Sequence, residues 1–309
     1  MRRATWTVVA LALVATFAAC ELTDVVLVDF TPVAVAEAYV TIADSRRDNR
    51  LSVFVHGTAP GSPPSSQSFD DAVVTVTDDD GVAHVLSLSV IDACVSEGPE
   101  GLGGSCFVAS TPVAASVRGG DALGLDVRLA DGRTLLGSTR VPGDFSVTGV
   151  GAGCRLIPDT RLPLRWSSSD GAWAYLSETL ILGLPAALAG EGIEAEDSLH
   201  LVGLSISESD TTVVFPSEFG VFDRLDLDQD LAVRLQEGLP EGASADIAIT
   251  ALDRNYVNWV RGGSFNPSGT VRVSSLVGDG SGVFGAAVTR RFVLTSTADT
   301  AAGPVCAGI

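Results

Sequence analysis

Short segments in which hydrophobic and polar residues alternate recur along the chain from about residue 25. Alternation with a period of two, in segments rich in Val, Thr and Ile, is typical of β-strands with one buried face. Asp, Gly, Pro and Ser separate the segments, and the Asp-Gly pair at 80–81 predicts a hairpin turn. A first group of strands is expected at 25–30, 33–42, 51–55, 72–77, 82–88, 106–109, 122–129 and 134–141.

A second group of similar segments follows a glycine-rich interval, 149–160, that has no regular pattern. Strands are expected there at 162–166, 172–182, 199–207, 211–215, 231–235, 245–252, 270–277 and 283–294. Asp253 can cap a short helix in which Tyr256, Trp259 and Val260 share one face. The Ala- and Glu-rich segment 185–197 is expected to be an exposed loop.

Strands at this spacing, with few helical segments between them, predict an all-β protein made of two β-sandwich domains. We expect an N-terminal sandwich of the immunoglobulin or transthyretin-like type over 25–147. A C-terminal, fibronectin-like sandwich with one or two short helices is expected over 148–309. The length of 309 residues gives each domain enough chain to bury a core of its own.

The first 20 residues have the pattern of an export signal: two arginines, an apolar segment at 4–17 and two alanines precede Cys20. This order resembles the lipobox of bacterial lipoproteins. The resemblance implies a signal peptide at 1–19, acylation of Cys20 and a short lipidated anchor at 20–24, and Glu21 implies transport to the outer membrane. Ordinary secretion with an incidental Cys20 is the alternative. The apolar segment is shorter than a membrane span, and no other segment has the 18 or so apolar residues that a span needs.

Four further cysteines, Cys94, Cys106, Cys154 and Cys306, form an even set in an exported chain, which predicts two disulfides. Three pairings are possible. We favour Cys94 with Cys106, because these residues flank a Gly-rich excursion between neighbouring strands. Cys154 would then pair with Cys306 and join the two ends of the second domain.

The charge of the chain excludes several classes of function. The formal charge is −19, and all 19 basic residues are arginines. Such an acidic chain has no basic face for nucleic acid. Without lysine it cannot use a lysine nucleophile, a Schiff base or a P-loop. Anionic lipid headgroups would repel its surface, so we expect membrane attachment through the lipid anchor.

The densest group of carboxylates is Asp223, Asp226, Asp228 and Asp230, with Glu237 at the twelfth position counted from Asp226. Such oxygens could bind calcium, which takes about six to eight oxygen ligands. A calcium loop needs glycine where this chain has Leu231, and the residues after it alternate as in a strand. We therefore favour a solvated acidic edge and keep Asp226, Asp228 and Asp230 as a weak calcium candidate.

Other patterns also have a simple structural explanation, and no cofactor is expected. Segment 280–285 matches G-x-G-x-x-G, but a strand follows it, so a hairpin turn is expected there and not a dinucleotide site. No local pattern indicates a zinc site or a catalytic triad, since the three histidines, at 56, 84 and 200, lie in different segments. Aromatic residues that could form a platform for sugars are expected to fill the core; they are Trp173, Tyr256, Trp259 and Phe265.

Besides the lipobox, the chain has short motifs at 71–81, 119–127, 141–142, 266–267 and 282–286. On these features it resembles a family of bacterial surface lipoproteins, domain of unknown function 4249. The resemblance implies an architecture and a location, and no catalytic residue. Such proteins are often encoded beside TonB-dependent receptors, which implies a receptor of that kind as partner. We therefore expect a non-enzymatic, outer-membrane-anchored lipoprotein that acts in binding or assembly at the cell envelope. The alternatives are an exported hydrolase, which a deep pocket with converging polar groups would favour, and a carbohydrate-binding module.

Overall fold

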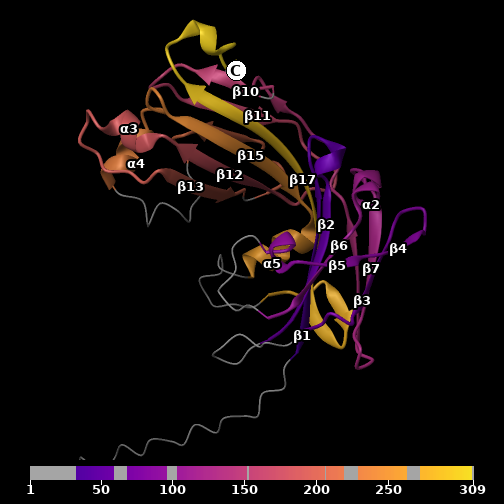
Figure 1. Ribbon diagram of the computed structural model, residues 1–309. Helices are drawn as coiled ribbons and strands as arrows, with labels where there is room; N and C mark the ends of the chain where they lie inside the picture. The colour runs from indigo at the N-terminus through magenta and orange to yellow at the C-terminus, as the bar shows by residue number, and fades with distance from the viewer. Residues whose placement is uncertain are drawn as a thin grey trace, which may run out of the picture. The chain divides into compact units, whose positions relative to one another are not determined.

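A computed structural model describes residues 33–58, 68–95, 103–151, 153–205, 207–218, 229–262 and 272–307 (Figure 1). In these residues the strands form three sheets of nine, five and three strands, and the helices are few and short. The prediction of an all-β, sandwich-type fold is confirmed. The expected strand at 25–30 and the anchor at 20–24 lie outside the described residues.

The largest sheet has the strand order β13-β12-β15-β17-β1-β2-β6-β5, and β10 pairs with the end of β17. Its strands are β1 (Ala34–Ile42), β2 (Arg50–Gly57), β5 (Ser87–Ser89), β6 (Ser105–Val108), β10 (Gly153–Leu156), β12 (Ala174–Leu182), β13 (Ser198–Leu204), β15 (Ser244–Leu252) and β17 (Gly280–Ser296). Alternation works as the sequence predicts: Ala36 and Ala38 are buried in the core, while Glu37 between them lies on the opposite face.

The five-stranded sheet, β16-β8-β7-β3-β4, shares a core with strands β1, β2 and β6. Its strands are β3 (Val73–Thr77), β4 (Ala83–Val85), β7 (Ala122–Arg128), β8 (Thr134–Arg140) and β16 (Leu276–Gly278). The segment 82–88 was expected to be one strand, but it divides at the buried Leu86. Its first part, β4, pairs with β3, whereas β5 pairs with β6 in the largest sheet, so this short segment crosses from one layer to the other.

The three-stranded sheet, β14-β11-β9, faces strands β12 and β15 across a second stretch of core. Its strands are β9 (Val147–Thr148), β11 (Leu162–Trp166) and β14 (Thr212–Phe215). The short helices are α2 (Thr111–Ser116), α3 (Leu184–Leu188), α4 (Gln229–Leu235) and α5 (Arg254–Arg261), with single 3₁₀ turns at η1 (Arg46–Asp48), η2 (Ile91–Ala93) and η4 (Thr300–Ala302).

Strand β17 belongs to both halves of the chain (Figure 1). Residues 280–288 pair with β1 in parallel, and residues 287–295 pair with β15 in the antiparallel sense. The predicted boundary between 147 and 148 therefore needs correction. Residues 276–288, from the C-terminal part, complete the N-terminal sandwich, and the chain from Val33 onward forms one compact unit. Local alternation cannot show which distant strand becomes a partner, because that choice depends on long-range packing.

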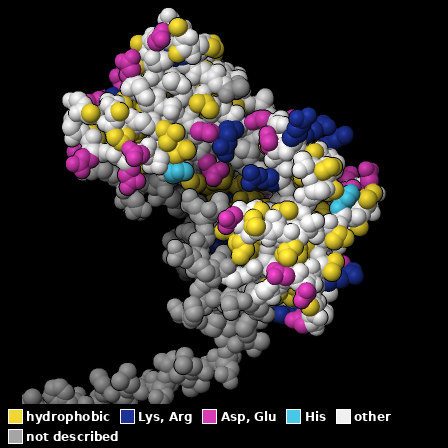
Figure 2. Space-filling model, viewed as in Figure 1, with side chains coloured by type: hydrophobic (Ala, Val, Ile, Leu, Met, Phe, Trp, Pro, Cys, Tyr) yellow, Lys and Arg dark blue, Asp and Glu magenta, His cyan; other side chains and the backbone are white. Residues whose placement is uncertain are grey.

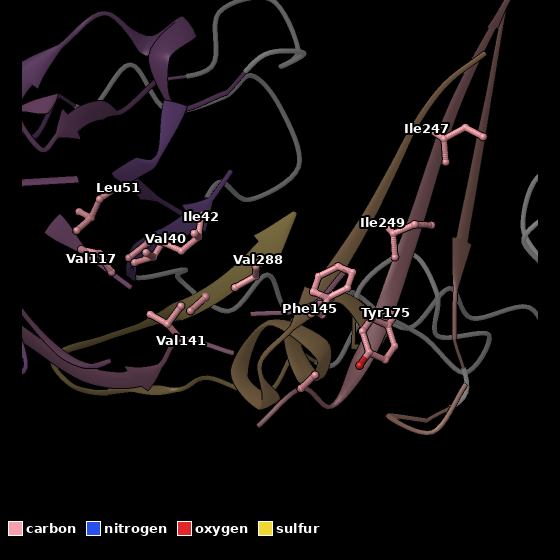
Figure 3. Close-up of a cluster of buried hydrophobic side chains, with 14 of the residues drawn as sticks. Val40, Ile42, Leu51, Val117, Val141, Phe145, Tyr175, Ile247, Ile249 and Val288 are labelled. Carbon is pink, nitrogen blue, oxygen red and sulfur yellow. The ribbon is translucent and has the colours of Figure 1, made fainter. Parts of the chain in front are cut away.

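The hydrophobic core is also continuous between the N-terminal and C-terminal halves of the chain. One cluster of buried side chains includes residues from all three sheets, and Figure 3 shows Val40 and Leu51 from the N-terminal strands together with Tyr175 and Ile247 from the C-terminal ones. Phe145 joins the two groups, since its ring meets that of Tyr175 edge to face with 5.9 Å between centroids.

Several predictions about local structure are wrong. The strand expected at 270–277 is present only at its end, because residues 272–275 are not in a strand and β16 begins at Leu276. Residues 231–235 were expected to be a strand but belong to α4, because Leu231 and Leu235, four residues apart, both reach the core from one helical face while Val233 is exposed. The segment 185–197 was expected to be an exposed loop, but it begins in α3, whose Leu184 and Leu188 are fully buried.

Helix α5 begins as predicted. The Asp253 carboxylate accepts a hydrogen bond from the Tyr256 amide at 2.9 Å, as an N-cap residue does. It also accepts hydrogen bonds from the Ala286 amide at 3.1 Å and the Thr139 hydroxyl at 2.6 Å. Burial raises the pKa of Asp253 despite these bonds. This one carboxylate therefore joins α5, β17 and β8.

Both expected disulfides are present. Cys94 is bonded to Cys106 across 12 residues, and Cys154 is bonded to Cys306 across 152 residues. The second disulfide joins β10 to the C-terminal segment. Next to it, the backbones of Arg155 in β10 and Val305 in the C-terminal segment pair in a single parallel β-bridge.

The surface in Figure 2 shows acidic side chains spread among hydrophobic and neutral ones over the whole face. Among the helices of the described residues, none has the length and apolar character needed to cross a bilayer.

Candidate functional site

Only some residues of the calcium candidate lie within the part of the chain that the structure describes. Asp226 and Asp228 lie outside the described residues. Asp230 is exposed in the first turn of α4, and Glu237 lies beyond that helix with its carboxylate 4.0 Å from Arg234. In the part of the chain that the structure describes, no three His, Cys, Asp or Glu side chains are grouped so that they could hold a metal ion.

The prediction of a hairpin turn at 280–285 is wrong, because the G-x-G-x-x-G segment is the first part of strand β17. Each of its glycines has a packing explanation. A Cβ at Gly280 or Gly282 would collide with the carbonyl oxygens of β1, and a Cβ at Gly285 would press on Tyr256 at 3.0 Å. The glycines let β17 lie close to β1 on one side and let α5 pack on it.

The four aromatic residues do not form one platform. Trp259 is buried beneath Arg272, whose guanidinium lies 4.7 Å from the ring centroid, and Tyr256 packs against Tyr39 at 5.0 Å. These two residues fill the core as expected. Phe265 lies outside the described residues, and Trp173 is 45% exposed, contrary to the expectation that it is a core residue.

The best-formed cavity lies at the edge of the C-terminal half of the fold, between strands β12 and β13 of the largest sheet and β11 and β14 of the smallest. We call it the edge cavity. It has a volume of about 240 Å³. Its lining is mostly apolar and comprises Leu164, Trp166, Tyr175, Ser177, Thr179, Leu201, Val202, Gly203, Leu204, Ser205, Asp210, Thr212, Val213, Phe215, Pro216, Glu218 and Ile247.

The wall of the edge cavity is rigidly held. Leu164, Tyr175 and Ile247 are almost completely buried. The Tyr175 hydroxyl accepts a hydrogen bond from the Ser169 amide at 2.7 Å, and burial raises the pKa of Tyr175, so the phenol remains neutral. The Trp166 ring meets Tyr175 edge to face at 5.5 Å.

The polar groups of the lining are mostly engaged by the protein itself. Ser205 Oγ donates to the Ser207 carbonyl at 2.9 Å and accepts from the Tyr175 amide at 2.8 Å. Thr212 Oγ1 donates to the Leu164 carbonyl at 3.1 Å, and Glu218 accepts from the Val214 amide at 2.7 Å.

Trp166 is the exception. It is 7% exposed, and its indole Nε1 is buried with no hydrogen-bond partner among the residues that the structure describes. An unpaired buried N–H costs about 1–3 kcal/mol. A ligand acceptor that displaced the atoms covering this donor and bonded to it would remove that cost.

None of the cavity residues was singled out in the sequence. The apolar ones have the pattern of ordinary strand residues, and the cavity forms where strands of two different sheets face each other. No local signal in the sequence marks that arrangement.

The chain was compared with known proteins. It matches no protein-family model and no curated protein. Among solved structures, 73% of this chain aligns with 15% of trypsin-activated alpha-2-macroglobulin from Escherichia coli, at 8% identity and a TM-score of 0.18. The aligned part is a small fraction of that protein, and a likeness this low supports no conclusion about fold or function.

Proposed function

We propose that this protein is a non-enzymatic, outer-membrane-anchored lipoprotein whose edge cavity binds a small apolar molecule with a hydrogen-bond acceptor. The observation that supports it most directly is a mostly apolar cavity of about 240 Å³ whose lining includes Trp166, a residue whose buried indole N–H has no partner among the described residues. An apolar cavity of about 150 Å³ already admits benzene. The edge cavity therefore has room for a somewhat larger molecule, such as a fused bicyclic ring.

The lining favours binding over hydrolysis. A hydrolase needs a nucleophile, a base within hydrogen-bond distance and donors for the oxyanion. The lining includes no histidine, and the Ser205 hydroxyl is already bonded on both sides within the protein.

The location is supported by two features. Disulfides form in oxidising compartments outside the cytosol, and the described chain contains two. Cys20, directly after the export signal, would supply the lipid anchor. Envelope partners, including a TonB-dependent receptor, belong to the same proposal, and co-purification with the tagged full-length chain tests them.

A fluorescence titration tests the binding. The neutral dye prodan, a substituted naphthalene whose ketone is a hydrogen-bond acceptor, should bind the protein and brighten. Gly203→Phe fills the cavity and should abolish the increase, while His200→Phe, on the opposite face of β13, should leave it unchanged. Equal dye binding by wild type and Gly203→Phe would reject the edge cavity as the site.

A separate experiment tests the anchor. Cys20→Ser should move the protein from the detergent phase to the aqueous phase of a phase-separation assay, because it removes the acylation site. If Cys20→Ser partitions as the wild type does, the protein is not held by a lipid on this cysteine.

A further inference from the structure

A second concave surface lies on another part of the fold, where the first turn of α5 meets strands β7 and β8 and the turn after β3. We call it the α5 groove. It encloses about 750 Å³ and is polar, in contrast to the edge cavity. The residues that matter for the argument are Asp78, Asp79, Arg140, Trp173, Arg254 and Asn255.

Trp173 offers the groove an aromatic surface. It is 45% exposed, which is unusual for a tryptophan in a chain with so few aromatic residues. Its backbone amide donates to the Leu252 carbonyl at 2.8 Å, and the Arg254 guanidinium lies 4.9 Å from its ring centroid. The backbone bond fixes the main chain at this residue and the Arg254 contact restrains the indole, so a ligand that stacks on the remaining surface costs less side-chain entropy.

The groove also offers hydrogen-bond donors. Arg140 Nη1 donates one hydrogen bond to the Gly120 carbonyl at 2.8 Å. A guanidinium has five N–H donors, so the others can bind a ligand. Arg254 contacts Trp173 and has no ion pair in the described residues.

Acceptors lie in the same groove. The Asp79 carboxylate accepts from the Ala122 amide at 3.0 Å, and Asp78 accepts from the Val82 amide and pairs with His84, both at 2.8 Å. Each carboxylate has about four lone-pair sites, so acceptor capacity remains at both.

The mixture of groups decides the class of ligand. An anion would meet three carboxylates, Asp78, Asp79 and Asp253, on a protein of formal charge −19, and a cation would meet two arginines. A neutral molecule whose hydroxyl groups both donate and accept, and whose ring has an apolar face, meets neither difficulty. We propose that the α5 groove binds a neutral saccharide, with one pyranose ring on Trp173 and hydroxyl groups bonded by Arg140, Arg254 and Asp79.

Calorimetric titration of the full chain with maltotriose, cellotriose and tri-N-acetylchitotriose tests this proposal. At least one trisaccharide should bind, and Trp173→Ala should weaken it about tenfold or more. Leu136→Ala is the matched control, because Leu136 is also 45% exposed but lies outside the groove, and it should bind normally. Trp173→Phe should retain part of the affinity, and Arg140→Ala should weaken binding in a protein with an unchanged unfolding temperature.

The proposal is overturned if none of the three trisaccharides binds, or if Trp173→Phe and Arg140→Ala both bind like the wild type. It is also overturned if the acidic trigalacturonate binds and the neutral trisaccharides do not. Gly203→Phe should leave saccharide binding intact, which separates this result from the test of the edge cavity.

Discussion

Glu37 shows how a single charged residue is held on the outer face of β1. Its carboxylate lies 3.6 Å from His56 Nε2 and 3.4 Å from Arg272 Nη1, and it accepts a hydrogen bond from the Tyr39 hydroxyl at 3.3 Å. Burial is the largest single influence and acts to raise the pKa of Glu37. The hydrogen bonds and positive charges around it outweigh burial and hold the pKa below its ordinary value of 4.5.

This lowered pKa predicts a pH effect on stability. The stabilisation from ionised Glu37 is present above the ordinary value of 4.5 and is lost as the pH falls through the lower folded value. Glu37→Gln cannot ionise, so its free energy of unfolding should fall less steeply below pH 4.5 than that of the wild type. Urea unfolding at a series of pH values measures this. Glu196→Gln, at an exposed position, is the control for the change in net charge, and a Glu37→Gln slope equal to the control's would contradict the account.

At the scale of single elements, α4 depends on two leucines. Leu235 is fully buried, and its truncation in Leu235→Ala should lower the free energy of unfolding by about 2–5 kcal/mol. Val233 lies on the outer side of the same helix and is 55% exposed, so Val233→Ala should change the free energy of unfolding by less than about 0.5 kcal/mol. Chemical denaturation of both variants gives the comparison, and similar losses would mean that α4 does not pack as described.

The same helix shows why sequence patterns predicted most strands and failed here. A strand pattern needs alternation, and residues 231, 233 and 235 provide it, yet Leu231 and Leu235 are also four apart, as on one helical face. Segment 185–197 lacked any regular pattern because its residues that reach the core are unevenly spaced: Leu188 is buried, and Ala187, Ile193 and Ala195 are partly buried against the core. The Asp253 cap was predictable because the signal is local.

The edge cavity could not be predicted for a different reason. Leu164 and Trp166 in β11 and Ile247 in β15 belong to two strands that are far apart in sequence, and each residue has the hydrophobicity of any core residue. The feature that points to a ligand is the unpaired N–H of Trp166, which depends on what surrounds the ring and not on its neighbours along the chain.

For the whole molecule, β17 makes the two halves depend on each other. A fragment ending at residue 147 would lack β16 and β17, leaving an unpaired edge on β1 and an open core. We predict that residues 25–147 alone do not fold, whereas residues 25–309 unfold in one cooperative transition. Amide dispersion in NMR spectra tests the fragment, and calorimetry tests the longer chain. A folded fragment would restore the division into two independent domains.

The central claim is that the edge cavity recognises an apolar ligand through the Trp166 N–H. The most direct test compares 1-indanone, which has a carbonyl acceptor, with indane, which has the same ring system without it, in the wild type and in Trp166→Phe. A net hydrogen bond contributes about 1 kcal/mol, so the ratio of 1-indanone affinity to indane affinity should be about fivefold higher in the wild type. The same ratio in both proteins, or binding of neither compound, would contradict the account.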